Sequence, residues 1–197
     1  MDTTNIFIAR KIAALTIPLQ EESIKRLASI LIRRDLDKGA QFVAKGEICT
    51  QIGYVHKGLV RQFYHKHKRD LTEHFSCEQE LFMCIESFLH QVPSDLAVEA
   101  LEDTVIYGIP HDPLIALCAE DYDIELLYRR LLEDALILSQ HKADFRRFET
   151  ASRRYGRLLR ERPQIVRRAP LSDIASYLLM SRETLSRVRA NLDKDDQ

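Results

Sequence analysis

The 197-residue sequence predicts an α+β fold, because helical periodicity at both ends encloses a segment of short β-favouring runs. In the first segment, Leu19, Leu27 and Leu31 follow Pro18 at helical spacing. In the middle segment, glycines recur every five to seven residues near candidate turns, and runs such as Leu59–Tyr64 favour strands. Repeated short strands of this kind predict a barrel or sandwich, with a short helical insert at Leu81–Leu89. The glycines are Gly39, Gly46, Gly53 and Gly58.

Length and composition exclude several classes of protein. The chain is long enough to bury a core, and 45% hydrophobic content with only 6 Gly and 6 Pro excludes collagen-like and wholly disordered chains. No apolar run is long enough to cross a membrane. The N-terminal stretch carries Asp2, Arg10 and Lys11, which excludes a secretory signal and leads us to expect a cytoplasmic protein. Four cysteines without CxxC spacing are expected to be reduced, buried thiols.

Charge is distributed unevenly along the chain. Residues 141–192 contain 13 Lys and Arg against 5 acids, a net charge of +8, although the whole chain carries −1. The rest of the chain is therefore acidic. A basic end on an acidic body suggests that this end meets a polyanion, and a solvated basic surface is the alternative.

A long helix is predicted after Pro110. One apolar stripe recurs at spacings of four and three, and it consists of Ile124, Tyr128, Leu131, Ala135 and Leu138. A second apolar set flanks it, comprising Leu127, Leu132, Leu136 and Ile137. We expect one face to cover the strands and the other to meet an identical helix in a homodimer, and we assign the five residues of the first stripe to the dimer helix. Packing only within the same chain is the alternative.

The spacing of apolar residues between Leu171 and Leu192 predicts a helix-turn-helix. Ser181 is a good N-cap for the second helix. At 100° per residue, Leu185, Val188 and Leu192 share a narrow arc, and Arg182, Glu183, Ser186 and Arg187 lie opposite. The expected core residues of the motif are Ile174, Ala175, Leu178, Leu185 and Val188.

A helix with this pattern suits the major groove of DNA. Arginine can donate twice to guanine, and glutamate can accept from cytosine. Hydroxyls and the helix N-terminus can hold phosphates. An ordinary helical hairpin with a solvated charged face is the alternative interpretation.

Three stretches resemble the CRP/FNR family of bacterial transcription regulators: Gly46–Arg61, Ile174–Leu178 and Ser181–Arg187. The resemblance covers residues 18–192. It implies a cyclic-nucleotide-binding-like β-roll (a double-stranded, jelly-roll-like β-helix) with flanking helices, a long dimerisation helix and a C-terminal helix-turn-helix. It also implies a homodimer without enzymatic activity. This dimer would bind a pseudo-palindromic site on double-stranded DNA, contact RNA polymerase and have no membrane partner. Arg182, Glu183 and Arg187 would then contact the bases. The expected segments are 1–34 (N-terminal helices), 35–110 (β-roll), 111–147 (dimer helix) and 148–197 (DNA-binding domain).

The sequence departs from this family at two points. Leu179 occupies a turn position that is usually glycine, where a left-handed backbone would cost about 1 kcal/mol or more. Only residues 193–197 follow the second helix, so the family's usual β-hairpin wing is not expected. Phosphate contacts are therefore assigned to Ser181, Thr184, Ser186, Arg153, Arg154 and Arg157.

No cofactor is expected. Residues 81–106 contain no Lys or Arg, so we expect no binding of cyclic AMP by the family's usual route, although Arg61 or a cation of the long helix could reach the site. The scattered cysteines do not predict an iron–sulfur cluster. Two other functions stay open: a metal-dependent cupin-like enzyme using His65 and His67 with Glu73 or His74, and a ligand-free protein-interaction module.

Overall fold

Two helices precede the first strand and pack against each other: α1 (Thr3–Ala14) and α2 (Glu21–Ile30). The structure, a computed structural model, describes residues 3–66 and 69–195. Asn5 joins the two helices, because its side-chain amide donates to the carbonyl oxygens of Ala28 and Leu31. After α2 the backbone becomes extended at once, so the first strand begins inside the segment that was predicted to be helical.

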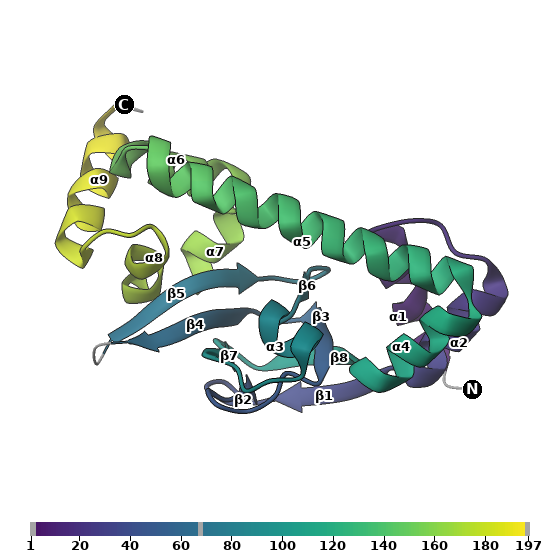
Figure 1. Ribbon diagram of the computed structural model, residues 1–197. Helices are drawn as coiled ribbons and strands as arrows, with labels where there is room; N and C mark the ends of the chain where they lie inside the picture. Colours follow the sequence, from purple (N-terminus) through teal and green to yellow (C-terminus); the bar gives the residue numbers. More distant parts are fainter. Residues whose placement is uncertain (1–2, 67–68, 196–197) are drawn as a thin grey trace.

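The strands of the described residues form two antiparallel four-stranded sheets (Figure 1). Their bounds are β1 (Ile32–Leu36), β2 (Gln41–Val43), β3 (Gln51–Lys57), β4 (Val60–Lys66), β5 (Arg69–Ser76), β6 (Leu81–Phe82), β7 (Leu96–Ala100) and β8 (Thr104–Pro110). The sheet orders are β1-β8-β3-β6 and β2-β7-β4-β5, so most neighbouring strands come from distant parts of the sequence. The short helix α3 (Ile85–His90) lies between β6 and β7. This roll confirms the predicted fold class.

Glycines have two different roles in the roll. Gly39, Gly46 and Gly58 have positive φ angles in turns, as the spacing predicted. Gly53 lies inside β3 rather than near a turn, so that prediction was wrong. A Cβ at Gly53 would lie 2.2 Å from the Phe82 ring, and the glycine therefore lets two strands of one sheet pack with an aromatic ring over the backbone.

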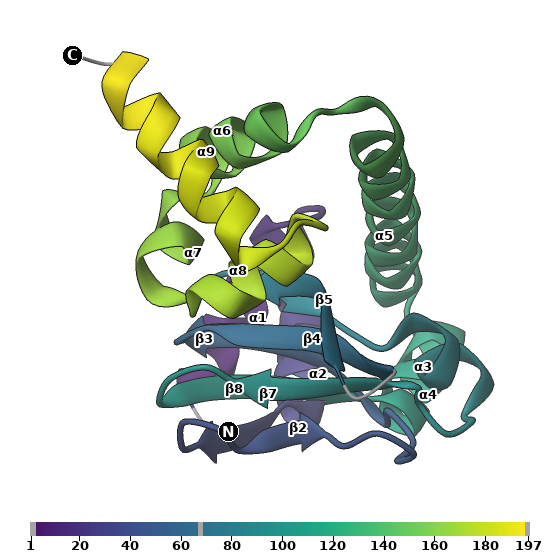
Figure 2. The same cartoon turned by 90° about the vertical axis from the view of Figure 1, so that its left-hand side faces the viewer.

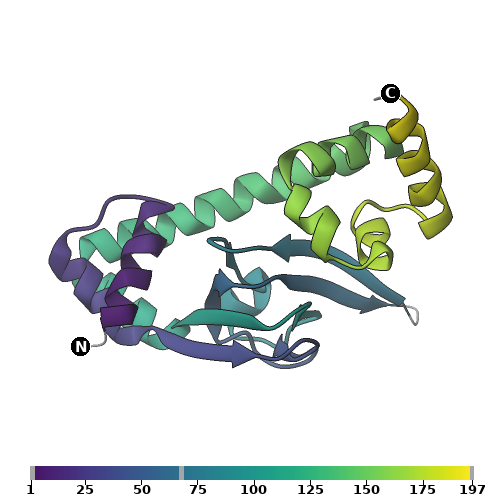
Figure 3. The same ribbon diagram turned by 180° about the vertical axis from the view of Figure 1, so that it is seen from behind.

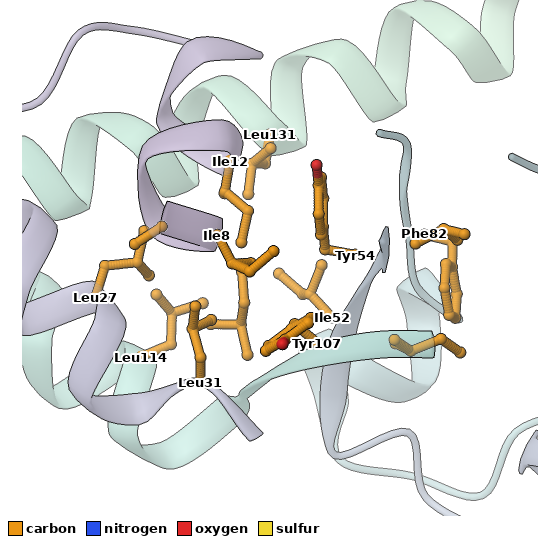
Figure 4. Close-up of a cluster of buried hydrophobic side chains, with 14 of the residues drawn as sticks. Ile8, Ile12, Leu27, Leu31, Ile52, Tyr54, Phe82, Tyr107, Leu114 and Leu131 are labelled. Atoms are coloured by element: carbon orange, nitrogen blue, oxygen red, sulfur yellow. The ribbon is translucent and has the colours of Figure 1, made fainter. Parts of the chain in front are cut away.

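The main core joins the N-terminal helices to both sheets of the roll. Figure 4 shows Ile8 and Ile12 of α1 pointing toward Ile52 and Tyr107 of the strands. Leu131 of the long helix closes the same cluster. Burying such side chains contributes roughly 1.5–3 kcal/mol each, so this cluster anchors the long helix to the roll.

Helices make up the chain from His111 onward. They are α4 (His111–Glu120), α5 (Tyr122–Phe148), α6 (Ala151–Glu161), α7 (Pro163–Arg168), α8 (Leu171–Tyr177) and α9 (Arg182–Asp195). Asp121 starts the long helix α5, because its carboxylate accepts from the backbone N–H groups of Asp123 and Ile124. Pro163 is the first residue of α7, and Pro170 precedes α8, so both prolines separate helices.

The long helix connects the two ends of the molecule. Figure 3 shows α1 and α2 at one end of α5 and the C-terminal helices at the other. Figure 2 shows α6 to α9 above the sheet that contains β4 and β5. No helix in residues 3–66 and 69–195 has the length and apolar content that a membrane span requires.

Candidate nucleic-acid interface

Helices α8 and α9 are joined by a tight turn. The N–H of Leu179 donates to the carbonyl of Ser176, and the N–H of Met180 donates to the carbonyl of Ala175 at 3.0 Å. This pair of bonds is a Schellman motif, which normally places glycine at the position that Leu179 occupies. Leu179 accordingly has φ +54°, a left-handed conformation that is strained for a residue with a Cβ.

Ser181 begins the second helix. Its Oγ accepts from the backbone N–H of Thr184 at 3.1 Å, which is the bond expected of an N-cap. The Thr184 hydroxyl lies 3.1 Å from the same oxygen. The first turn of α9 is therefore held in helical geometry before any partner arrives.

The two faces of α9 have different surroundings. Leu185 and Val188 are buried in a second core with Ile174, Ala175 and Leu178 of the first helix. Arg182, Glu183, Ser186 and Arg187 are exposed on the opposite face. The side chain of Leu192 lies outside the described residues.

Charge on the exposed face is available for contacts. The pKa of Glu183 is lowered by its own backbone N–H at the helix N-terminus and by Ser181, so the carboxylate stays ionised as an acceptor. The Arg187 guanidinium makes only a long contact of 3.5 Å with the carbonyl of Glu183. Arg182, Glu183 and Arg187 are thus exposed hydrogen-bond donors and acceptors on a helix whose opposite face is buried.

The cations assigned to phosphates lie on α6, which contacts α9. Arg153 is exposed. Arg154 is half-buried, and its Nε has no hydrogen-bond partner within the described residues. Arg157 pairs with Glu149 and lies over the Phe145 ring, 5.1 Å from its centroid. Arg157 is therefore engaged within the chain.

Four other cations of the basic segment also pair with the chain's own roll. Arg168 holds Glu78 at 2.8 Å and Glu102 at 2.6 Å. Arg162 pairs with Glu80 and donates to the carbonyl of Phe75 at 3.1 Å. Lys142 and Arg146 both contact Glu73. Part of the charge asymmetry that suggested a polyanion is therefore neutralised between the roll and the C-terminal helices.

A buried ionic cluster fastens α8 to the roll. Arg61 of β4 is only 5% exposed, and its guanidinium contacts Glu99 at 2.6 Å, Asp173 at 2.9 Å and Asp70 at 3.0 Å. The guanidinium also lies over Phe63, 4.1 Å from the ring centroid. Three carboxylates around one cation leave excess negative charge, and burial raises the pKa of Glu99.

Backbone contacts reinforce this attachment. The N–H of Thr72 donates to Ser176 Oγ at 2.9 Å, and that hydroxyl donates to the carbonyl of Asp70 at 3.1 Å. Phe75 packs edge-on against Tyr177 with ring centroids 5.4 Å apart. We name this attachment of α7 and α8 to the roll the clasp, with Arg61 and Arg168 as its central cations.

Solved structures with the same architecture match most of the chain. FixK2 from Bradyrhizobium japonicum has a TM-score of 0.71 at 21% identity, covering 85% of this chain and 86% of that chain. The Catabolite Activator Protein of Thermus thermophilus has a TM-score of 0.58 at 23% identity, covering 94% and 88%. A protein of Eubacterium rectale assigned to the crp/fnr family of transcriptional regulators has a TM-score of 0.61 at 18% identity, covering 90% and 85%.

The chain has the CRP/FNR fold. The fold implied by the sequence resemblance is therefore confirmed. No family model and no curated protein matches the sequence.

In this CRP/FNR fold a cavity of about 1170 Å³ lies between the roll and α5. Residues 81–106 contribute Glu86 and Asp95 to its lining and no cation. The lining cations among the described residues are Lys66, Lys142 and Arg162, and Arg61 instead faces the clasp. Lys142 is the cation of the long helix that reaches this space.

His74 of β5 is a buried histidine in the cavity wall. Its Nδ1 has no hydrogen-bond partner within residues 3–66 and 69–195. Burial lowers its pKa well below 6.5, and the charges of Lys142 and Arg162 lower it further. His74 is therefore neutral at physiological pH.

The predicted apolar stripe of the long helix α5 faces the rest of the same chain. Ile124 and Leu131 are fully or nearly buried in the main core, Tyr128 packs against it, and Ala135 and Leu138 line the cavity. Of the flanking apolar set, Leu127 is fully buried in the main core, whereas Leu136 is 71% exposed and Ile137 52% exposed, so these two residues form an open apolar face. The expected dimer contact thus shifts from the stripe to this neighbouring face, because the stripe is needed to hold α5 on the roll.

The cupin-like hypothesis depends on histidines that the structure separates. His65 is exposed near the tip of the β4–β5 hairpin and contacts Asp70 at 2.8 Å, whereas His74 is buried. His67 lies outside the described residues. Within the described part of the chain, no group of three or more His, Cys, Asp and Glu side chains is arranged to hold a metal ion.

Proposed function

We propose that this protein is a homodimeric, sequence-specific DNA-binding transcription regulator whose helix α9 enters the major groove. The observation that carries the proposal is the division of α9 into a buried face, with Leu185 and Val188, and an exposed face with Arg182, Glu183 and Arg187. A helix of this kind fits the groove, and its N-terminal side chains reach base edges. The fold it shares with FixK2 and the Catabolite Activator Protein supports the same function.

Base contacts are assigned to the three charged residues. Arg182 and Arg187 donate to guanine O6 and N7, and Glu183 accepts from cytosine N4. Ser181, Thr184 and Ser186 contact phosphates near the helix N-terminus. Arg153 and Arg154 add phosphate contacts from α6, and Arg157 joins them only if it releases Glu149.

Dimerisation is assigned to α5. A second copy packs on the face that carries Leu136 and Ile137, parallel to the first helix along a two-fold axis. This arrangement presents two α9 helices to two half-sites of a pseudo-palindromic operator. RNA polymerase is the expected further partner of the promoter-bound dimer.

The clasp sets the position of α9 relative to α5. Since Arg61 of the roll binds Asp173 of α8, and Arg168 of α7 binds Glu78 and Glu102 of the roll, a change in the roll moves the helix-turn-helix as a unit. The spacing of two such units then determines how well they match the roughly 34 Å repeat between half-sites. The roll is thus the sensory part of the regulator.

Cyclic AMP is not the effector we expect in the cavity. Its cyclic phosphate would need a cation, but Lys142 and Arg162 already pair with carboxylates, and Glu86 and Asp95 add negative charge. The third lining cation, Lys66, is an exposed side chain at the end of β4 that lies over the Tyr64 ring. Cyclic AMP should therefore leave the melting temperature unchanged, and a clear rise on its addition would contradict this part of the proposal.

Selection from a pool of random DNA duplexes tests the proposed function. Repeated capture by the full chain should enrich two inverted half-sites whose centres lie about 10–10.5 bp, or a multiple of that, apart. A matched selection with the triple variant Arg182→Ala, Glu183→Ala and Arg187→Ala should enrich no consensus. A wild-type selection that also enriches none would overturn the proposal.

A further inference from the structure

The β4–β5 hairpin carries two exposed cations where its strands meet the connecting turn. Strand β4 ends at Lys66 and strand β5 begins at Arg69, and both side chains are exposed. Lys66 lies over the Tyr64 ring, 5.0 Å from its centroid. Within residues 3–66 and 69–195, neither cation has a carboxylate partner. Both charges are therefore available to a partner outside the chain.

The strand register places the two cations side by side. Lys66 and Arg69 are direct partners across the hairpin, so their side chains lie on the same face, where like charges repel each other. Asp70 follows Arg69 and lies on the opposite face, because successive residues of a strand alternate. There it contacts Arg61 at 3.0 Å and His65 at 2.8 Å. The nearest carboxylate in the sequence is therefore engaged elsewhere, and an anion between Lys66 and Arg69 would stabilise them.

The clasp fixes this part of the hairpin beside the helix-turn-helix. The Ser176 hydroxyl, in the last turn of α8, donates to the carbonyl of Asp70, the residue next to Arg69. Ser181, which caps α9, follows Ser176 after one tight turn. Figures 1 and 3 show β4 and β5 ending beside α8 and α9, at the end of the molecule opposite α1 and α2. Figure 2, which views this end, shows α9 in front of the other helices, so a duplex on α9 would approach from the side of the hairpin.

Helix α6 offers few free cations for the phosphates of such a duplex. Arg157 pairs with Glu149, and Arg154 is half-buried, so Arg153 is the exposed arginine among the three assigned there. Contacts from Lys and Arg to phosphates supply a large share of the affinity of proteins for DNA. A further pair of exposed cations next to α9 therefore suits the same partner.

We propose that Lys66 and Arg69 bind phosphates of the duplex that α9 contacts, so that the β4–β5 hairpin gives the roll a DNA contact of its own. This inference rests on the proposed DNA-binding function. A phosphate near both side chains relieves their mutual repulsion and forms charge-assisted hydrogen bonds with them. Such contacts add affinity without reading sequence. The roll then touches the DNA directly, in addition to positioning α9 through the clasp.

The salt dependence of operator binding tests the proposal in the full chain. Lys66→Ala and Arg69→Ala should each reduce the salt slope by about 0.9, and the double variant should reduce it by about 1.8. Between about 50 and 200 mM salt, the affinity of the wild type should therefore fall about 12-fold more than that of the double variant. Lys66→Arg and Arg69→Lys keep the charge and should keep the wild-type slope.

Two comparisons separate a DNA contact from other effects of losing a cation. Lys11 is also an exposed lysine over an aromatic ring, 5.5 Å from the centroid of Phe7, but it lies on α1 at the opposite end of the molecule. Lys11→Ala should therefore keep the wild-type slope. Lys66 also lines the cavity, whereas Arg69 does not, so an equal effect of Arg69→Ala excludes an action through the cavity.

Ethylation of single operator phosphates locates the contact. Ethylation at some positions should block the wild type but not the variant that lacks both Lys66 and Arg69, and Arg153→Ala should release a different set of phosphates. A double variant with the wild-type slope and the wild-type pattern of blocked phosphates would overturn the inference. It would leave the proposed DNA-binding function intact, because the wild type would still select its operator. A wild type that selects no operator would overturn both.

Discussion

The turn between α8 and α9 requires an unusual backbone conformation at Leu179. The Schellman bonds require a left-handed backbone there, and the chain adopts it with leucine at φ +54°. The side chain is 48% exposed and contributes little packing in return. The packing of the buried residues on either side of the turn, Leu178 and Leu185, offsets this backbone strain.

At position 179 a glycine variant should be more stable than an alanine variant, the reverse of the usual order in helices. Leu179→Gly should be more stable than Leu179→Ala by about 1 kcal/mol, because both lose the same side chain but only alanine keeps a Cβ in the left-handed region. Urea unfolding of the two variants measures the difference. At exposed Ser172 of α8 the same pair should show the opposite order. An alanine variant at 179 as stable as the glycine variant would contradict the turn geometry.

His74 predicts a specific pH dependence of stability. Its folded pKa lies well below its unfolded value of about 6.5, so its contribution is fully present above that value and is lost as the pH falls below it. Unfolding free energies measured at several pH values should therefore fall more steeply below about pH 6.5 in the wild type than in His74→Gln. The exposed His141→Gln variant should keep the wild-type slope. Equal slopes in wild type and His74→Gln would refute the assignment.

Residue types and local spacing predicted the caps, the turn and the two faces of α9. They could not predict that Arg157, Arg162 and Arg168 would bind carboxylates of the same chain, because the partners of Arg162 and Arg168 lie far away in sequence. Counting charges therefore overstated how much of the basic segment is free for DNA.

At the scale of elements, the clasp is the feature that periodicity could not reveal. The strand β4 and the helix α8 were foreseen in outline, but the pairing of α8 with β5 depends on the tertiary register of Ser176 against Thr72. The packing of the apolar stripe on α5 was likewise not determined by periodicity. Periodicity predicted the helix, but apolar residues on both sides left open which face the roll would cover.

Removing Arg61 tests the energetics of the clasp. Arg61→Ala should lower the free energy of unfolding by about 3–5 kcal/mol, because Glu99, Asp173 and Asp70 lose their shared cation in a mostly buried site. Combining Arg61→Ala with Glu99→Gln should recover part of this loss by removing one unpaired carboxylate. Urea unfolding provides the measurement.

A matched control uses an exposed pair. Arg33 contacts Asp35 on β1 with both side chains more than half exposed, so Arg33→Ala should cost no more than about 1 kcal/mol. A similar small loss for Arg61→Ala, or no recovery in the double variant, would show that the buried cluster does not fasten α8 to the roll.

At the scale of the whole molecule, α5 connects the main core to the helix-turn-helix (Figure 1). The exposed side chains of Leu136 and Ile137 leave one apolar face of α5 uncovered. A regulator that binds two half-sites needs this face to meet its own copy. The overall order of roll, long helix and helix-turn-helix was predictable, because it follows from periodicity and from the resemblance of three short stretches. The relative placement of these parts follows from ion pairs and packing that connect distant segments.

A charge on the open face of α5 should separate the dimer. Ile137→Glu places a carboxylate beside its symmetry mate in the proposed interface, so sedimentation equilibrium should find a dimer for the wild type and a monomer for the variant. Phe7→Glu alters a similarly exposed apolar residue on α1 and should remain dimeric. A wild-type monomer would contradict the proposed dimerisation, and a dimeric Ile137→Glu variant would place the interface elsewhere.

The most direct measurement compares Arg187→Ala with Arg153→Ala, each binding the selected operator and a random duplex. Both variants lose one cation, but Arg187 is assigned to a base and Arg153 to a phosphate. Arg187→Ala should weaken operator binding by about 1–3 kcal/mol, roughly 5- to 150-fold, with a much smaller loss on random DNA. Arg153→Ala should weaken both alike and reduce the salt slope by about 0.9. Equal losses on operator and random DNA for Arg187→Ala would contradict base reading by α9.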